Sequence, residues 1–93
     1  MKIFCVIAYD IGDNRRRTKI ANLLENYGQR MQYSLFECYL RRRDYLILRD
    51  KLNELINLTT DRIFFYFIDD VHRKQIERIG GAAPLSDRKW TIV

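Results

Sequence analysis

The sequence contains little cysteine, proline, glycine or histidine. Its 93 residues include 2 cysteines, 1 proline, 4 glycines and 1 histidine. Cys5 and Cys38 lie far apart inside apolar segments, with no second cysteine or histidine at ligand spacing, so the sequence indicates two buried thiols and no zinc site. The few glycines form no phosphate-binding loop, and no serine or cysteine nucleophile lies in a recognisable catalytic motif.

Long apolar runs are also missing. The opening stretch, MKIFCVIAY, is too short to cross a membrane and lacks the small-residue cleavage pattern of a signal peptide. We therefore expect a cytoplasmic protein with no membrane segment. The chain has no long repeat and no low-complexity segment, and its length predicts a single domain over residues 1–93.

The sequence does contain an excess of positive charge. Lysine and arginine number 17 against 12 acidic residues, which gives a net charge of +5, and 47% of the residues are hydrophobic. This composition describes a folded basic protein whose expected partner is a polyanion such as nucleic acid. A moderate basic excess is also common on ordinary solvated surfaces, so charge alone leaves both interpretations open.

Hydrophobic periodicity predicts alternating strands and helices. The pattern gives a strand at 2–9, a helix from residue 14 that Gly28 stops, strand material at 30–40, a helical face at 45–56 and a strand at 62–68. Asp13 or Asn14 can cap the first helix. The stretch 30–40 is either two short strands or one bent strand, because no glycine or proline marks a hairpin.

This order of elements predicts an α/β (α+β) fold of the ferredoxin-like kind. Such a β-α-β-β-α-β sandwich has an antiparallel sheet with two helices on one face. A short possible strand at 75–80 and the terminal KWTIV at 89–93 add strand material at the end. We interpret residues 80–93 as a C-terminal extension that reaches a dimer partner.

The predicted sheet is apolar on both faces. In the first strand, Ile3, Ile7 and Tyr9 fall in one row, and Phe4 and Val6 fall in the other. Two helices cover only one face, so we expect a second copy to cover the other face in a homodimer. The segment 89–93 then pairs with an edge strand of the partner or, alternatively, within its own chain.

Asp10 is the candidate for metal chemistry. It lies where the first strand gives way to the loop before a helix, a common place for reactive groups in α/β folds. One carboxylate is a poor Mg²⁺ site, but a two-fold axis near this strand end would let two Asp10 side chains share one hydrated ion. The alternative is an aspartate that accepts hydrogen bonds from loop amides.

Two arginine clusters stand at predicted helix starts. A helix N-terminus carries a partial positive charge, so the cations at 15–17 and 41–43 break the local preference. Free amides and guanidinium groups together make a phosphate site, so we predict phosphate contacts from Arg15, Arg16, Arg17, Arg41, Arg42 and Arg43. The two helices of this fold begin at opposite ends, so the two clusters of each chain, doubled by a dimer, form a long basic track; the alternative is a solvated patch.

These segments resemble a known family. The stretches CVIAYDIGDNRRRTKIANLL, GQRMQYSLFECYL and RIFFYFI are similar to the second of the two CRISPR adaptation proteins, the small one that partners the CRISPR integrase. The resemblance covers nearly the whole chain. It implies a homodimer, a Mg²⁺-dependent endonuclease acting on single-stranded RNA or duplex DNA, and a bridge between integrase subunits during spacer acquisition.

The resemblance also implies site residues. The metal ligand of the family corresponds by position to Asp10 and its neighbour to Tyr9. The basic and aromatic contributors correspond to Arg17, Lys19, Arg30 and Phe36. Lys19 stands where an arginine can occur, which keeps the charge and loses the fork geometry.

Two functions remain open at this stage. In the first, Mg²⁺ between two Asp10 carboxylates supports phosphodiester hydrolysis, Tyr9 or Phe36 positions the nucleic acid, and Arg17 stabilises the developing charge. In the second, the dimer is a DNA-binding scaffold without a physiological nuclease. We favour the scaffold as the physiological role, because no proton shuttle is visible.

Overall fold

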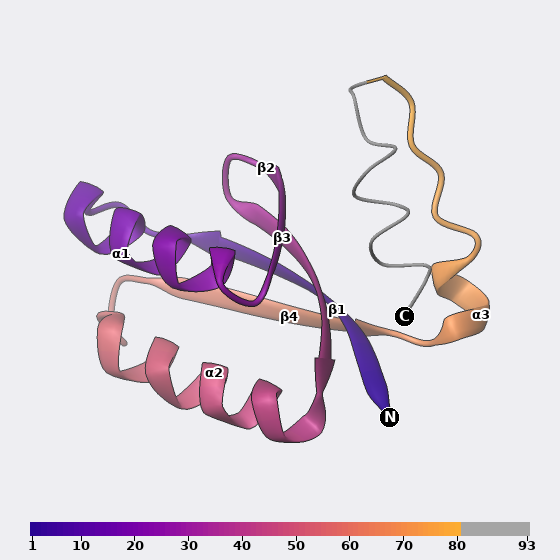
Figure 1. Ribbon diagram of the computed structural model, residues 1–93. Helices are drawn as coiled ribbons and strands as arrows, with labels where there is room; N and C mark the ends of the chain where they lie inside the picture. Colours follow the sequence, from indigo (N-terminus) through magenta and orange to yellow (C-terminus); the bar gives the residue numbers. More distant parts are fainter. Residues whose placement is uncertain (81–93) are drawn as a thin grey trace.

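The computed structural model describes residues 1–80 and has a sheet with two long helices packed on one side (Figure 1). Its elements are β1 (Lys2–Asp10), α1 (Asn14–Glu25), β2 (Gly28–Gln32), β3 (Leu35–Arg41), α2 (Arg42–Leu55), β4 (Arg62–Ile68) and the short α3 (Asp70–Arg73). The four strands form an antiparallel sheet in the order β2-β3-β1-β4. The predicted α/β fold is therefore confirmed.

The strand register sets where the two helices begin. β1 pairs antiparallel with β3, with Lys2 opposite Arg41 and Ala8 opposite Leu35. The chain leaves β1 at Asp10 to form α1, and it leaves β3 at Arg41 to form α2. The two helix starts consequently lie at opposite ends of the sheet, as the sequence predicted.

Helix α1 begins at a side-chain cap and ends earlier than predicted. The carboxylate of Asp13 accepts a hydrogen bond from the Arg16 backbone N–H at 2.9 Å. The helix ends at Glu25, so the prediction that Gly28 stops it is wrong. Gly28 instead opens β2, where a Cβ atom would lie 2.4 Å from both the Cys38 Sγ and the Glu37 carbonyl oxygen.

The stretch predicted as one bent or two short strands forms two strands. A two-residue turn, Tyr33 and Ser34, connects β2 to β3 and leaves Gln32 opposite Leu35. No non-glycine residue in the described chain has a positive φ, so this turn needs no glycine. That explains the missing hairpin signal. The register also shifts between Arg30 and Gln32.

The core lies between the sheet and the two helices. Its buried members come from every second residue of β1 and β3, from the residue just after β1 and from one face of each helix: Cys5, Ile7, Tyr9, Ile11, Ile20, Ala21, Leu24, Phe36, Cys38, Leu40, Leu48 and Leu52. Cys5 and Cys38 are free, buried register partners, which confirms the predicted thiols. Burial raises the pKa of each thiol to about 12.

The outward face of the sheet is only partly covered. Over β3, Glu37 is buried and its carboxylate accepts a hydrogen bond from the Arg78 guanidinium at 2.6 Å. Over β4, Phe64 and Tyr66 are 44% and 53% exposed, and their stacked rings lie 6.2 Å apart. The chain therefore covers its own β3 by a polar contact that the sequence analysis did not foresee, and it leaves an aromatic patch, defined here as Phe64 and Tyr66, on β4.

The end of the described chain differs from the sequence prediction. Residues 75–80 form no strand, so that possible strand is wrong; backbone bonds from Gln75 to His72 and from Ile76 to Arg73 continue a helical turn instead. The segment KWTIV and residues 81–93 of the predicted extension lie outside the described residues. None of the helices within residues 1–80 has the length and apolar character needed to cross a membrane.

Candidate nucleic-acid interface at the end of the first strand

Asp10 is an exposed carboxylate between two buried residues. Tyr9 and Ile11 are 5% and 3% exposed and face the helices. Alternation along β1 therefore places Asp10 on the outward face, the face that carries Val6 and the aromatic patch. Its register partner on β4 is Arg62. We call Asp10, residues 11–13 and the Tyr33–Ser34 turn the Asp10 end.

The described chain supplies too few ligands for a complete metal site. Within residues 1–80, no three His, Cys, Asp or Glu side chains group closely enough to hold a metal ion. Mg²⁺ takes one or two carboxylates and completes its octahedron with water and phosphate oxygens. The exposed Asp10 carboxylate fits that donor set if a second copy contributes its own Asp10, so the shared ion stays a prediction.

Tyr9 and Phe36 lie in the core, not on the surface. The Tyr9 hydroxyl donates to the Tyr33 carbonyl oxygen at 3.1 Å, and burial raises the pKa of this phenol. Its ring lies 6.3 Å from the fully buried Phe36 ring. Neither ring offers an exposed surface on which a base could stack, and the Tyr9 hydroxyl holds the turn instead. The positioning of nucleic acid by Tyr9 or Phe36 stays a prediction.

Arg16 has an internal partner. Its Nε and Nη2 donate to the two carboxylate oxygens of Asp61 at 2.7 and 3.2 Å, and the Asp61 side chain has no exposed surface. The Asn57 backbone N–H also donates to Asp61 at 2.9 Å. The hydrogen bond from Arg16 lowers the pKa of Asp61. A cation at this helix start therefore neutralises a buried carboxylate that the sequence analysis missed.

Arg17 ties the Asp10 end together. Its Nη1 donates to the Ile11 carbonyl oxygen at 2.7 Å and to the Gly12 carbonyl oxygen at 3.3 Å, and its Nη2 donates to the Asn14 side chain. Its Nε donates to the Tyr33 hydroxyl at 3.1 Å. The guanidinium group thus donates hydrogen bonds to other residues of the same chain. These bonds join the residue after Asp10 to the β2–β3 turn.

Arg30, on β2, holds the same turn. Its Nε and Nη2 donate to the Tyr33 carbonyl oxygen at 3.1 and 2.6 Å. The guanidinium carbon lies 5.4 Å from the Tyr33 ring centre and 5.7 Å from the Phe36 ring centre. Tyr33 is thus a member of this site that sequence analysis missed, because the turn that exposes it carries no sequence signal.

The remaining predicted cations are exposed. Arg15 and Lys19 lie one turn apart on α1 and line a surface hollow with Asn14 and Thr18. Arg41, Arg42 and Arg43 are exposed at the start of α2, where Arg41 caps the helix without a side-chain hydrogen bond. The two clusters thus occupy opposite ends of the sheet. Phosphate contact by them stays a prediction.

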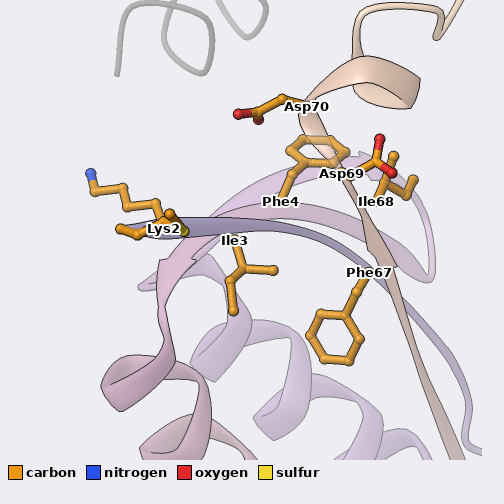
Figure 2. Close-up of a pocket in the computed structure, with 8 residues that line it drawn as sticks. Lys2, Ile3, Phe4, Phe67, Ile68, Asp69 and Asp70 are labelled. Atoms are coloured by element: carbon orange, nitrogen blue, oxygen red, sulfur yellow. The ribbon is translucent and has the colours of Figure 1, made fainter.

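A cavity of about 440 Å³ lies where β1 begins and β4 ends, at the end of the sheet opposite Asp10 (Figure 2). In Figure 2, Phe4 and Asp70 lie on one side of the sheet, and Ile3 and Phe67 lie on the other. Its lining residues are Met1, Lys2, Ile3, Phe4, Phe67, Ile68, Asp69 and Asp70. The cavity contains none of the predicted site residues.

Comparison with known proteins identifies similar sequences and structures. Residues 1–76 match the family model described as CRISPR associated protein Cas2. A protein of Synechocystis sp. named CRISPR-associated endoribonuclease Cas2 3 is 41% identical over 88 residues, which is 95% of this chain and 95% of that protein. The crystal structure of Streptococcus pyogenes Cas2 at pH 6.5 matches with a TM-score of 0.75 and 28% identity, over 83% of this chain and 99% of that one.

A third similarity is to a chain in an assembly. A chain of the structure titled partial Cas6-RT-Cas1--Cas2 complex is 31% identical, covers 85% of both chains and has a TM-score of 0.72. By its title, that structure is a complex of Cas2 with Cas6-RT-Cas1.

Proposed function

Because this chain belongs to the Cas2 family of CRISPR-associated proteins, we propose that it is a nucleic-acid-binding homodimer with Mg²⁺-dependent endonuclease activity. Its partner is the CRISPR integrase subunit, which it bridges during the acquisition of new spacers in the cytoplasm. The names of the relatives support the nuclease, and the complex containing Cas1 and Cas2 supports the partner. The exposed Asp10 carboxylate at the end of β1 carries the proposal.

The outward face supports the homodimer. The aromatic patch leaves large ring surfaces in water, and Asp10 belongs to the same face. Exposed apolar surface of this kind marks an interaction site. A two-fold axis that lies between two such faces and runs parallel to the strands would bring two copies of the patch together and both Asp10 carboxylates to the same end of the stacked sheets.

The Asp10 end suits hydrolysis of a phosphodiester. Mg²⁺ bound there would polarise the scissile phosphate and lower the pKa of a bound water molecule. The Asp10 carboxylate of each copy would hold the ion, while Arg17 keeps the loop after Asp10 in place through the Ile11 and Gly12 carbonyl oxygens. Arg15 and Lys19 are exposed on the adjacent helix and attract the phosphate backbone of RNA or DNA.

The test of the nuclease is Asp10→Asn, which keeps the shape of the side chain and removes its charge. We expect metal-dependent RNA cleavage to fall by about two orders of magnitude or more, since both halves of the shared site are lost together. Asp50→Asn, an exposed aspartate on α2, is the matched control and should cleave like the parent. Cleavage by Asp10→Asn at the parent's rate would exclude Asp10 as the metal ligand.

A second candidate function is a DNA-binding scaffold without physiological cleavage. The exposed cluster Arg41–Arg43 favours it, because this cluster lies at the end of the sheet opposite Asp10 and has no place in the hydrolysis. Replacing all three arginines by alanine should weaken duplex binding for any sequence. It should also flatten the plot of log K against log salt by roughly one unit per lost phosphate contact. An unchanged slope would mean that these side chains only face solvent.

A further inference from the structure

The β2–β3 turn presents an exposed aromatic ring at the Asp10 end. Tyr33 is 68% exposed, and it occupies the first position of the two-residue turn. An exposed tyrosine by itself does not indicate a binding site, because much of any protein surface is apolar. This one differs because three neighbouring side chains hold it in place.

Backbone and hydroxyl contacts fix the position of Tyr33. Its carbonyl oxygen accepts hydrogen bonds from the Tyr9 hydroxyl at 3.1 Å and from the Arg30 guanidinium at 2.6 Å. Its hydroxyl accepts from the Arg17 Nε at 3.1 Å. A ligand that meets this ring therefore finds it already ordered, which reduces the entropy lost on binding.

Two cations lie close to the ring. The guanidinium carbons of Arg17 and Arg30 are 5.7 and 5.4 Å from its centre, within the range of a cation–π contact. An ordered aromatic ring beside positive charge is the combination with which proteins bind single-stranded nucleic acid, the ring for a base and the charge for the backbone.

Hydrogen bonds connect the Tyr33 turn to the residues next to Asp10. Arg17 donates both to the Tyr33 hydroxyl and to the carbonyl oxygen of Ile11, the residue after Asp10. The Tyr9 backbone N–H also donates to the Ser34 carbonyl oxygen at 3.1 Å, which joins β1 to the same turn. Hydrogen bonds therefore join the Tyr33 turn to the backbone on both sides of Asp10.

A purely structural role does not account for the ring. The contacts from Tyr9 and Arg30 go to the backbone carbonyl of Tyr33, which any residue would provide. With 68% of the residue in water, the ring adds little to the burial that stabilises the core. The side chain contributes one structural contact, the hydroxyl that accepts from Arg17, and beyond it a largely exposed ring near two guanidinium groups.

We propose that the Tyr33 ring stacks against an unpaired nucleobase and so holds a single-stranded segment of nucleic acid at the Asp10 end. In a duplex the faces of each base are covered by its neighbours in the stack, so only an unpaired base can offer a face to this ring. The proposal rests on the proposed function, since it adds a nucleic-acid-binding residue to the same site.

The experiment measures binding separately from cleavage. Tyr33→Ala, Tyr33→Leu and Tyr33→Phe are made in the Asp10→Asn background and assayed with chelator present. The probes are a short single-stranded RNA with a fluorescent adenine analogue, whose emission changes on stacking, and an RNA duplex of the same sequence. Leu58→Ala, a 75% exposed residue outside the Asp10 end, is the control.

We expect the alanine and leucine variants to bind the single strand about tenfold or more weakly and to lose the emission change, because both lack a π surface. Tyr33→Phe should keep both, and this rescue separates stacking from a folding defect. Duplex affinity should stay within about twofold in every variant, because phosphate contacts supply it. Leu58→Ala should behave like the parent with both probes.

The proposal is overturned if the parent does not bind the single strand, if Tyr33→Ala binds it as the parent does, or if single-strand and duplex affinities fall together. These outcomes are independent of the nuclease. Tyr33-dependent binding by a protein that cleaves nothing refutes the endonuclease alone. Asp10-dependent cleavage without any Tyr33 effect on binding refutes the stacking alone.

Discussion

Replacing Tyr66 by lysine tests the proposed homodimer most directly. Tyr66 lies on the outward face of β4, is 53% exposed and stacks on the 44% exposed Phe64. In an isolated chain a lysine at this position reaches water and costs little. In a dimer packed on this face the same lysine carries a charge into the apolar interface of each copy.

The exposed fraction sets the size of the effect. A tyrosine presents about 200 Å² of surface, so about 100 Å² of Tyr66 is left for a partner to bury. At about 25 cal/mol per Å² this burial contributes about 2.5 kcal/mol per copy and about 5 kcal/mol per two-fold dimer. The dissociation constant should therefore rise by up to about three to four orders of magnitude.

Sedimentation equilibrium over a range of concentrations measures this change. The parent should sediment with about twice the chain mass at micromolar concentration, and Tyr66→Lys should sediment as a monomer with an unchanged circular dichroism spectrum. Ile47→Lys, at a 40% exposed position on α2, is the matched control and should remain dimeric. A monomeric parent, or a Tyr66→Lys dimer as tight as the parent, would refute the assignment of this face.

Three further predictions concern the fold. The hydrogen bond from Arg16 holds the pKa of Asp61 below the ordinary value of 3.8, so the stabilisation is present above pH 3.8 and is lost as the pH falls through the folded-state pKa. Asp61→Asn should therefore flatten the acid side of the curve of unfolding free energy against pH, measured by urea titration from about pH 5 to pH 2. Gly28→Ala should lower the unfolding free energy by about 1–3 kcal/mol because its Cβ meets Cys38 at 2.4 Å, whereas Gly12→Ala, with open space around it, should be nearly neutral; equal melting curves would contradict this. Cys5 and Cys38, with pKa values of about 12, should resist a thiol reagent at neutral pH until denaturant is added, and fast labelling of the native protein would disprove their burial.

Local patterns were sufficient for the elements of the fold. The strands at 2–9 and 62–68 and both long helices follow from periodicity, because side-chain spacing alone decides which face a residue occupies. The hairpin at 28–41 stayed ambiguous because its turn uses ordinary backbone angles and no glycine. The strand suggested at 75–80 failed because a short apolar pattern does not reveal whether a neighbouring strand will pair with it.

The candidate site was predictable only in part, for a related reason. The position of Asp10 at a strand end follows from the sequence, and its exposure agrees with it. Phe36 is fully buried because the helices cover its face of β3, and the sequence alone did not show which face that is. Asp61 and Tyr33 were missed because each acquires its role from a residue distant along the chain.

The sequence by itself determined the order of elements, the apolar rows of the sheet and the two arginine clusters at opposite helix starts, since these depend on neighbours a few residues apart. Only the tertiary structure decided how each arginine is used. Arg15 faces water, Arg16 neutralises Asp61 from 45 residues away, and Arg17 binds the loop and turn at the Asp10 end. Three identical side chains in a row differ in function because a buried carboxylate and a free carbonyl attract a guanidinium group only where the fold brings them within hydrogen-bonding distance.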